Sequence, residues 1–69
     1  MNKGDMYRVT AEIVNRYGAE PYKYSQLRVG HVLRVTRETK SGNVYMWHDS
    51  PFYAVMIHAE DVSLLQRLS

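Results

Sequence analysis

Three histidines are the side chains of this 69-residue chain best suited to binding a metal ion. His31, His48 and His58 are far apart in the sequence and form none of the short spacings that bring two imidazoles to one metal. The chain has no cysteine, which excludes thiolate ligands, disulfides and cysteine nucleophiles. The sequence therefore predicts neither a metal site nor a bound cofactor.

The run His48-Asp49-Ser50 contains the residue types of a hydrolase triad. Neighbouring side chains on a strand point to opposite faces, so the three would not converge there. Pro51 follows them and favours a turn in which Asp49 and Ser50 bond to the backbone. The four glycines are widely scattered and form no phosphate-binding loop. These patterns favour a protein that is not an enzyme.

Aromatic and basic residues offer a different chemistry. Six Tyr, one Trp and one Phe are more aromatic rings than so small a domain can place in its interior. Exposed rings beside arginines form platforms that suit a protein partner or a single-stranded nucleic acid. The candidate binding residues are Tyr22, Tyr24 and Trp47 as anchors, with Lys23, Arg28 and Arg37 to orient the partner.

The positive charge is modest and uneven. Nine Lys and Arg against seven Asp and Glu give a net charge of +2. Residues 1–35 contain six basic and three acidic side chains, whereas residues 36–69 contain three and four. This bias can orient the domain toward an anionic partner, but it is weaker than the footprint of a dedicated nucleic-acid binder.

The length fits one domain, residues 1–69, with a flexible segment at 1–5 and a folded part at 6–68. A core this small must use nearly every apolar side chain, or the chain must bury further area by self-association. No apolar run approaches the roughly 18 residues of a membrane helix, and no apolar segment follows the first residues as in a signal peptide. We therefore expect no membrane partner and a cytoplasmic location.

Alternating apolar and polar residues predict strands over Tyr7–Val14, 32–38 and 44–48. Over 32–38, Leu33 and Val35 share one face, and Arg34, Thr36 and Glu38 share the other with Val32. The strand at 44–48 buries either Val44 and Met46 or Tyr45 and Trp47. The run Phe52–Ile57 is apolar on both faces, which predicts a central strand or one that closes a barrel.

The residues between these strands also predict the kind of connection that each pair of strands has. Residues 18–30 break the pattern and predict a long first loop, pinned by Leu27 and Val29. Residues 39–43 predict a hairpin loop in which Gly42 can take a positive φ. Residues 59–68 fit a helix, or a 3₁₀ turn at 60–62 followed by a short edge strand; the second is favoured.

This order of elements resembles the Src-homology-3-like barrel: a first strand, a long loop, a three-strand meander, a Glu60-Asp61-Val62 turn and a last short apolar segment. The resemblance covers residues 7–66 and implies an all-β fold, a small five-stranded barrel. The arrangement is also similar to that of small proteins encoded by bacteriophages and other mobile elements. The aromatic signature of the proline-peptide binders is missing, since Trp47 stands alone and the first loop has Tyr22 and Tyr24 around a lysine.

These observations favour a non-enzymatic interaction module that binds a protein partner through an aromatic and basic surface. That surface would comprise the 18–30 loop and the central hairpin. Two alternatives remain open: binding of single-stranded DNA or RNA by the same surface, and a structural homo-oligomer.

Overall fold

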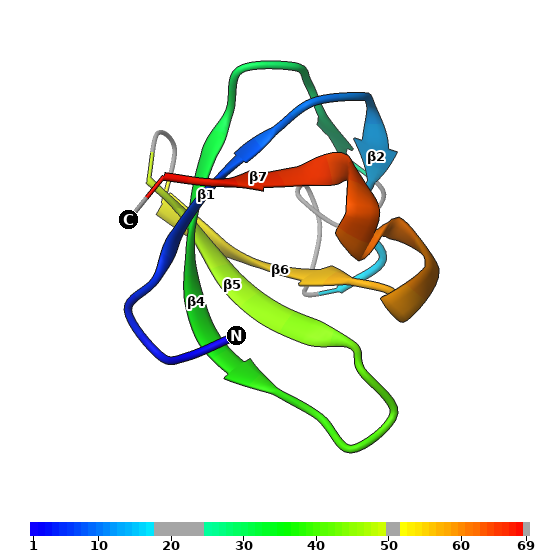
Figure 1. Cartoon of the computed structure of the whole chain (residues 1–69). Coiled ribbons are helices and arrows are strands. Elements are labelled where there is room, and N and C mark those ends of the chain that lie inside the picture. Colours follow the sequence, from blue (N-terminus) through cyan, green and yellow to red (C-terminus); the bar gives the residue numbers. More distant parts are fainter. Residues whose placement is uncertain (18–24, 50–51, 69) are drawn as a thin grey trace.

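The computed structural model describes residues 1–17, 25–49 and 52–68 (Figure 1). The described part is mainly β, as the sequence predicted, with strands and one 3₁₀ helix, η1. The elements in chain order are β1 (Met6–Val9), β2 (Ile13–Val14), β3 (Gln26–Leu27), β4 (Val32–Glu38), β5 (Val44–Asp49), β6 (Phe52–Ile57), η1 (Ala59–Leu64) and β7 (Leu65–Arg67). The same segments contain no helix long and apolar enough to cross a membrane.

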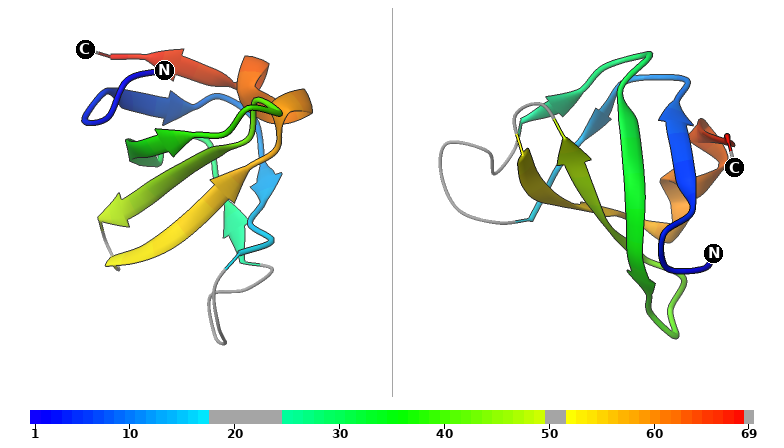
Figure 2. Two further views of the ribbon diagram at one scale, coloured as in Figure 1. Left: turned by 90° about the horizontal axis from the view of Figure 1, so that it is seen from below. Right: turned by 90° about the vertical axis from the view of Figure 1, so that its left-hand side faces the viewer.

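Five of the strands form one antiparallel sheet in the order β6-β5-β4-β1-β7, and β2 and β3 form a separate two-stranded ribbon (Figure 2). The sheet is strongly curved, but β6 and β7 are its two edges and do not pair with each other. The predicted closed five-stranded barrel is therefore wrong in two respects: the sheet is open, and the ribbon adds two strands.

The core lies inside the curved sheet and is built by alternate residues of each strand. On β5, Val44 and Met46 point inward and are almost fully buried, which leaves Tyr45 and Trp47 on the outer face. The sequence left open which alternate residues of this strand are buried, and the structure shows that they are Val44 and Met46. The buried apolar residues are Tyr7, Val9, Ile13, Leu27, Leu33, Val35, Val44, Met46, Val55 and Ile57.

The predicted strand over Tyr7–Val14 is two strands in different sheets. The break follows Thr10, whose backbone N–H and hydroxyl both donate to the Leu64 carbonyl, at 2.8 and 2.7 Å. These bonds end the pairing of β1 with β7, and the chain then turns into the ribbon, where Ile13 pairs with Leu27. Leu27 is fully buried as predicted, but Val29 is 64% exposed and does not pin the loop.

The prediction that Phe52–Ile57 is central or closes a barrel is wrong, because β6 is an edge strand of an open sheet. Part of this edge is covered by Asn15, which follows β2 and is fully buried. Its side-chain oxygen accepts hydrogen bonds from the N–H groups of Met56 (3.2 Å) and Tyr17 (3.1 Å), and its amide nitrogen donates to the Tyr17 carbonyl (3.0 Å). The Asn15 side chain thus satisfies one backbone N–H group at the edge of β6, that of Met56.

A β-bulge in β4 changes which of its side chains share a face. Val35 lies opposite Met46 and Arg37 lies opposite Tyr45, so β4 has one residue more than β5 in this interval. In a regular ladder Thr36 would face Tyr45, and Arg37 would face the buried Val44. The expectation that Glu38 shares the outer face with Arg34 is therefore wrong: Arg37 takes that face and Glu38 lies opposite Val44.

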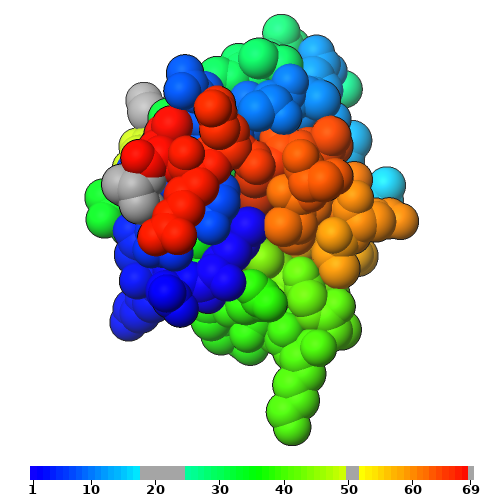
Figure 3. All heavy atoms as spheres, in the orientation of Figure 1, coloured from blue at the N-terminus to red at the C-terminus, as the bar shows by residue number. Residues whose placement is uncertain are grey.

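The C-terminal elements follow the favoured prediction, a 3₁₀ helix and then a short edge strand. Gly42 has the expected positive φ of 87°, and a Cβ there would lie 3.2 Å from the Cβ of Ala59. Beside it, the Asn43 side-chain oxygen accepts the Ala59 N–H at 3.0 Å, which attaches the β4–β5 hairpin to η1. In Figure 3 the C-terminal strand, η1 and the N-terminal segment lie on one face, and the hairpin projects below them.

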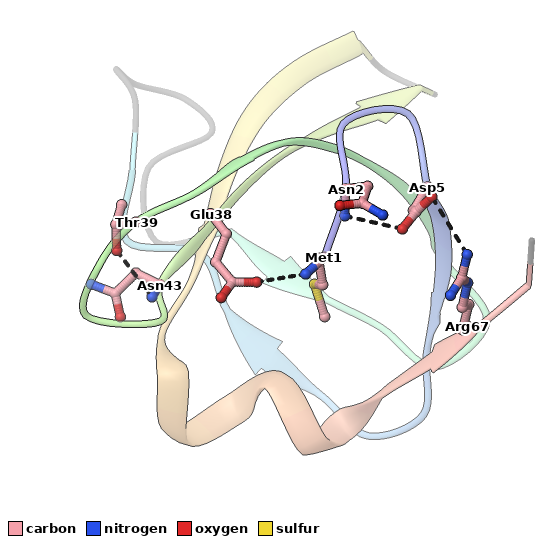
Figure 4. Close-up of polar contacts among 7 residues, drawn as sticks. All are labelled: Met1, Asn2, Asp5, Glu38, Thr39, Asn43 and Arg67. Carbon is pink, nitrogen blue, oxygen red and sulfur yellow. Dashed lines mark hydrogen bonds and ion pairs between the residues drawn. The ribbon is translucent and has the colours of Figure 1, made fainter.

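Residues 1–5 form a turn against the sheet (Figure 4). The Met1 ammonium group donates to a Glu38 carboxylate oxygen at 2.8 Å, and the Gly4 N–H donates to the Val35 carbonyl at 2.9 Å. Asp5 accepts from the Asn2 N–H and lies 3.7 Å from the Arg67 guanidinium. The flexibility expected for this segment stays a prediction.

Replacement of Asn15 by Ala tests whether this amide holds the ribbon to the sheet. The change leaves the Met56 N–H and both Tyr17 backbone groups without their amide partner, and we expect it to lower the free energy of unfolding by about 3 kcal/mol. Asn43→Ala is the matched control, because it removes an amide bond at a more exposed site and should cost only about 1 kcal/mol. Urea unfolding of both variants gives the comparison; equal losses would show that Asn15 has no special role.

Candidate functional site

The outer face of β4, β5 and β6 gathers aromatic and basic side chains in two rows across the strands. In one row Arg34 lies opposite Trp47, which lies opposite Ala54. In the other, the bulge places Arg37 opposite Tyr45, which lies opposite Met56. We call this surface the aromatic face; it comprises Tyr17, Arg34, Thr36, Arg37, Tyr45, Trp47, Phe52, Ala54 and Met56.

The rings of the aromatic face contact one another. Trp47 and Phe52 are stacked, with centroids 4.6 Å apart and planes inclined by 13°. Tyr17 meets Tyr45 edge to face at 5.0 Å, and the Arg37 guanidinium lies 4.4 Å from the Tyr45 ring centroid. Phe52 remains 65% exposed despite its stacking. Large apolar groups are thus held in fixed positions at the surface.

A depression of about 160 Å³ opens on this face. Ala54 has the smallest side chain at the site, so the space lies between the larger side chains around it. Its walls are mainly apolar and also include the polar residues Thr36 and Arg37, a composition that suits the insertion of one side chain. The lining residues are Tyr17, Thr36, Arg37, Tyr45, Met46, Trp47, Ala54 and Val55.

Tyr17 is an aromatic residue of this site that the sequence did not indicate. Its backbone is fixed by the two bonds to Asn15, and its ring is thereby placed against Tyr45. An Asn two residues before a Tyr is a weak local-turn signal. Nothing in the sequence shows that this Asn is buried and bound to Met56, 41 positions away.

The charges on the outer face are mostly positive. Arg34 and Arg37 are exposed, and Arg8 of β1 is on the same side of the sheet, because its neighbours Tyr7 and Val9 point inward. Among the described residues of β4, β5 and β6, the acidic residue on this face is Asp49, opposite Phe52 at the end of β5. Within the described segments, neither Arg34 nor Arg37 has a carboxylate within 4.0 Å. Both arginines are therefore available to an anionic group.

The structure brings together only part of the predicted site. Trp47 and Arg37 line the same depression. Arg28 does not join them: it lies in the turn after β3, where its backbone N–H donates to the His31 Nδ1 at 3.2 Å. Tyr22, Lys23 and Tyr24 lie outside the described residues, so their part in the site stays a prediction.

Comparison of the sequence with protein-family models and with curated proteins, and of the fold with solved structures, gives no match.

Two histidines that are distant in sequence meet inside the sheet. The rings of His31 and His48 contact edge to face at 4.6 Å, and His48 stacks on Tyr53 at 4.8 Å. His48 is buried while Asp49 is exposed on the opposite face, as expected for neighbours on a strand. Among the residues that the structure describes, no three His, Cys, Asp or Glu side chains gather as metal ligands would.

His31 should make stability depend on pH. Burial, followed by the nearby His48 and Arg28, lowers the pKa of His31 below its ordinary 6.5. The unfolded chain therefore binds a proton more readily than the folded one, so acid favours unfolding. We expect the free energy of unfolding to fall as the pH drops from about 6.5 to the lower pKa of the folded state.

Urea unfolding between pH 7.5 and 4.5 measures this loss. In His31→Asn, the Asn oxygen can still accept the Arg28 N–H but does not titrate, so the decline near pH 6 should be smaller than in the parent. A parent and a variant with identical pH profiles would show that His31 does not contribute.

Proposed function

We propose that this protein is a non-enzymatic interaction module that binds a protein partner through the aromatic face. The observation that supports this most directly is the apolar depression beside the stacked rings of Trp47, which is half-buried, and Phe52, which is exposed. Aromatic side chains and arginines at a preformed hollow are the usual composition of protein-binding hot spots. We keep the cytoplasm as the proposed location, and the Src-homology-3-like arrangement as the proposed relation of the meander, the 3₁₀ helix and the last strand.

The ring contacts favour a protein over a nucleic acid. Bases bind single-strand platforms by stacking on free aromatic faces. Here one face of Trp47 is covered by Phe52, and Arg37 lies against the Tyr45 ring. The space that remains is concave and suits an inserted side chain better than a stacked base. The arginines of the face are the observation that favours the nucleic-acid alternative.

Truncation of Trp47 tests the proposal. Random peptides displayed on phage would be selected against the parent protein, and the affinity of the enriched peptides measured by fluorescence anisotropy. We expect Trp47→Ala to weaken their binding by about thirtyfold or more, because hot-spot truncations typically cost at least about 2 kcal/mol. Leu68→Ala removes an exposed apolar side chain outside the aromatic face and should leave the affinity unchanged.

A second variant separates binding from folding. Ala54→Leu would fill the depression without removing a core side chain, and it should weaken the same peptides while circular dichroism and the Tm stay close to those of the parent. If peptides bind both variants as well as they bind the parent, the aromatic face is not the site.

The two alternative functions give different results. Nucleic-acid binding would appear as affinity for a single-stranded oligonucleotide that falls steeply between 50 and about 200 mM salt. A structural homo-oligomer would sediment as a larger species whose fraction rises with concentration. Either result, together with a failure to enrich peptides that need Trp47, would overturn the proposal.

A further inference from the structure

We infer that the ligand of the aromatic face is an extended acidic peptide: one apolar side chain enters the depression, and carboxylates two and four residues away bind Arg37 and Arg34. This inference rests on the proposed function and adds the chemistry and spacing of the partner.

The depression limits the anchor to one side chain. A space of about 160 Å³ holds a leucine or a similar apolar group but not two of them. Its walls are mainly aromatic and aliphatic, and Ala54 leaves the room that a larger residue on β6 would occupy. Burial of a leucine is favourable by about 1.5–3 kcal/mol, which is enough to select an apolar residue at this position.

The charged side chains of the aromatic face determine on which side of the anchor the acidic residues of the peptide would lie. From the depression toward β4, the face carries Arg37 and Arg34, both exposed. Toward β6 it carries apolar side chains, and its acidic residue, Asp49, lies at the end of β5 opposite Phe52. Carboxylates on the ligand would therefore be attracted on the β4 side of the anchor.

The Arg37 side chain is preorganised to bind a carboxylate. Its guanidinium is held 4.4 Å from the Tyr45 ring centroid, a cation–π contact that restricts its motion. This contact leaves the N–H groups in the guanidinium plane available for a bidentate bond to a carboxylate. The free guanidinium thus loses less conformational entropy on binding than an unrestrained arginine would.

The spacing follows from strand geometry. Alternate residues of an extended peptide point to the same side, and each pair of residues spans about 6.7 Å. Neighbouring strands are about 4.8 Å apart, so β6 and β4 are separated by about 10 Å. Arg37 reaches back over Tyr45 on β5, which places its charge nearer to the anchor than that of Arg34. Acidic residues at the second and fourth positions would lie about 6.7 and about 13.4 Å from the anchor, on either side of the separation of about 10 Å between β6 and β4, and the length of the arginine side chains spans the difference.

The inference can be tested with synthetic peptides of Gly and Ser that carry one Leu. In the matching peptides, Asp stands two and four residues from the Leu, in either chain direction. The comparison peptides have Asp at one and three residues, Lys at two and four, or Ser throughout. Binding is followed by the shifts of the Trp47 indole and Arg37 Nε signals in ¹⁵N–¹H spectra.

We expect one of the matching peptides to bind about tenfold more tightly than its shifted, Lys and Ser counterparts. Arg37→Gln should weaken the matching Asp peptide more than the Ser peptide, which has no carboxylate to lose, and so reduce this preference about fivefold. Arg28→Gln makes the same change in net charge away from the aromatic face, and should have no effect.

The outcomes distinguish the inference from the proposed function. Equal affinity for the Asp, Lys and Ser peptides, with shifts at Trp47, would overturn the acidic ligand and leave the protein-binding face intact. No shift at Trp47 with any peptide would overturn the inference, and the displayed-peptide selection would then decide the proposed function separately. Displacement of the matching peptide by a single-stranded oligonucleotide of higher affinity would assign the arginines to phosphate and also overturn it.

Discussion

The composition of the aromatic face depends on the register of β4 against β5. The inward positions of β5 are taken by Val44, Met46 and His48, so Tyr45 and Trp47 must lie outside. The β-bulge in β4 then determines which charged side chain lies opposite Tyr45. It places Arg37 opposite Tyr45 and moves Glu38 to the side of Val44, where the carboxylate binds the Met1 ammonium group. A regular ladder would have put a carboxylate on the aromatic face and an arginine toward the core, and both changes would disfavour an anionic ligand.

The open edge of the sheet is the second constraint. A closed barrel satisfies every backbone group by pairing strands, whereas here β6 is an edge. The Asn15 amide accepts the Met56 N–H from that edge and also binds both Tyr17 backbone groups. The side chain that helps to protect the edge therefore also positions Tyr17 on the aromatic face. Stability and the shape of the depression are coupled through one buried side chain.

The sequence predicted those features that depend on local alternation and turn chemistry. The strands at 32–38 and 44–48, the hairpin with Gly42 and the final 3₁₀ helix and edge strand are all present. It could not predict features set by contacts between distant residues. The division of 7–14 into two strands depends on Leu64, the burial of Asn15 depends on Met56, and the bulge is fixed by pairing with β5. The sequence indicated Arg37 and Trp47, which line the depression together. For the same reason it did not indicate Tyr17, and it grouped Arg28 with them although Arg28 lies in the turn after β3.

The division of side chains between core and surface bears on function. The buried apolar set is mostly Val, Leu, Ile and Met, with one tyrosine, because the space inside so small a curved sheet favours compact side chains. The larger rings of Tyr45, Trp47 and Phe52 lie outside, where they contribute little to the core. Exposed rings are a liability for a small domain, since they promote association. Their fixed stacking, the adjacent arginines and the hollow at Ala54 limit which partner can cover them, and a ligand that matches all three features would turn this exposed apolar area into specific binding.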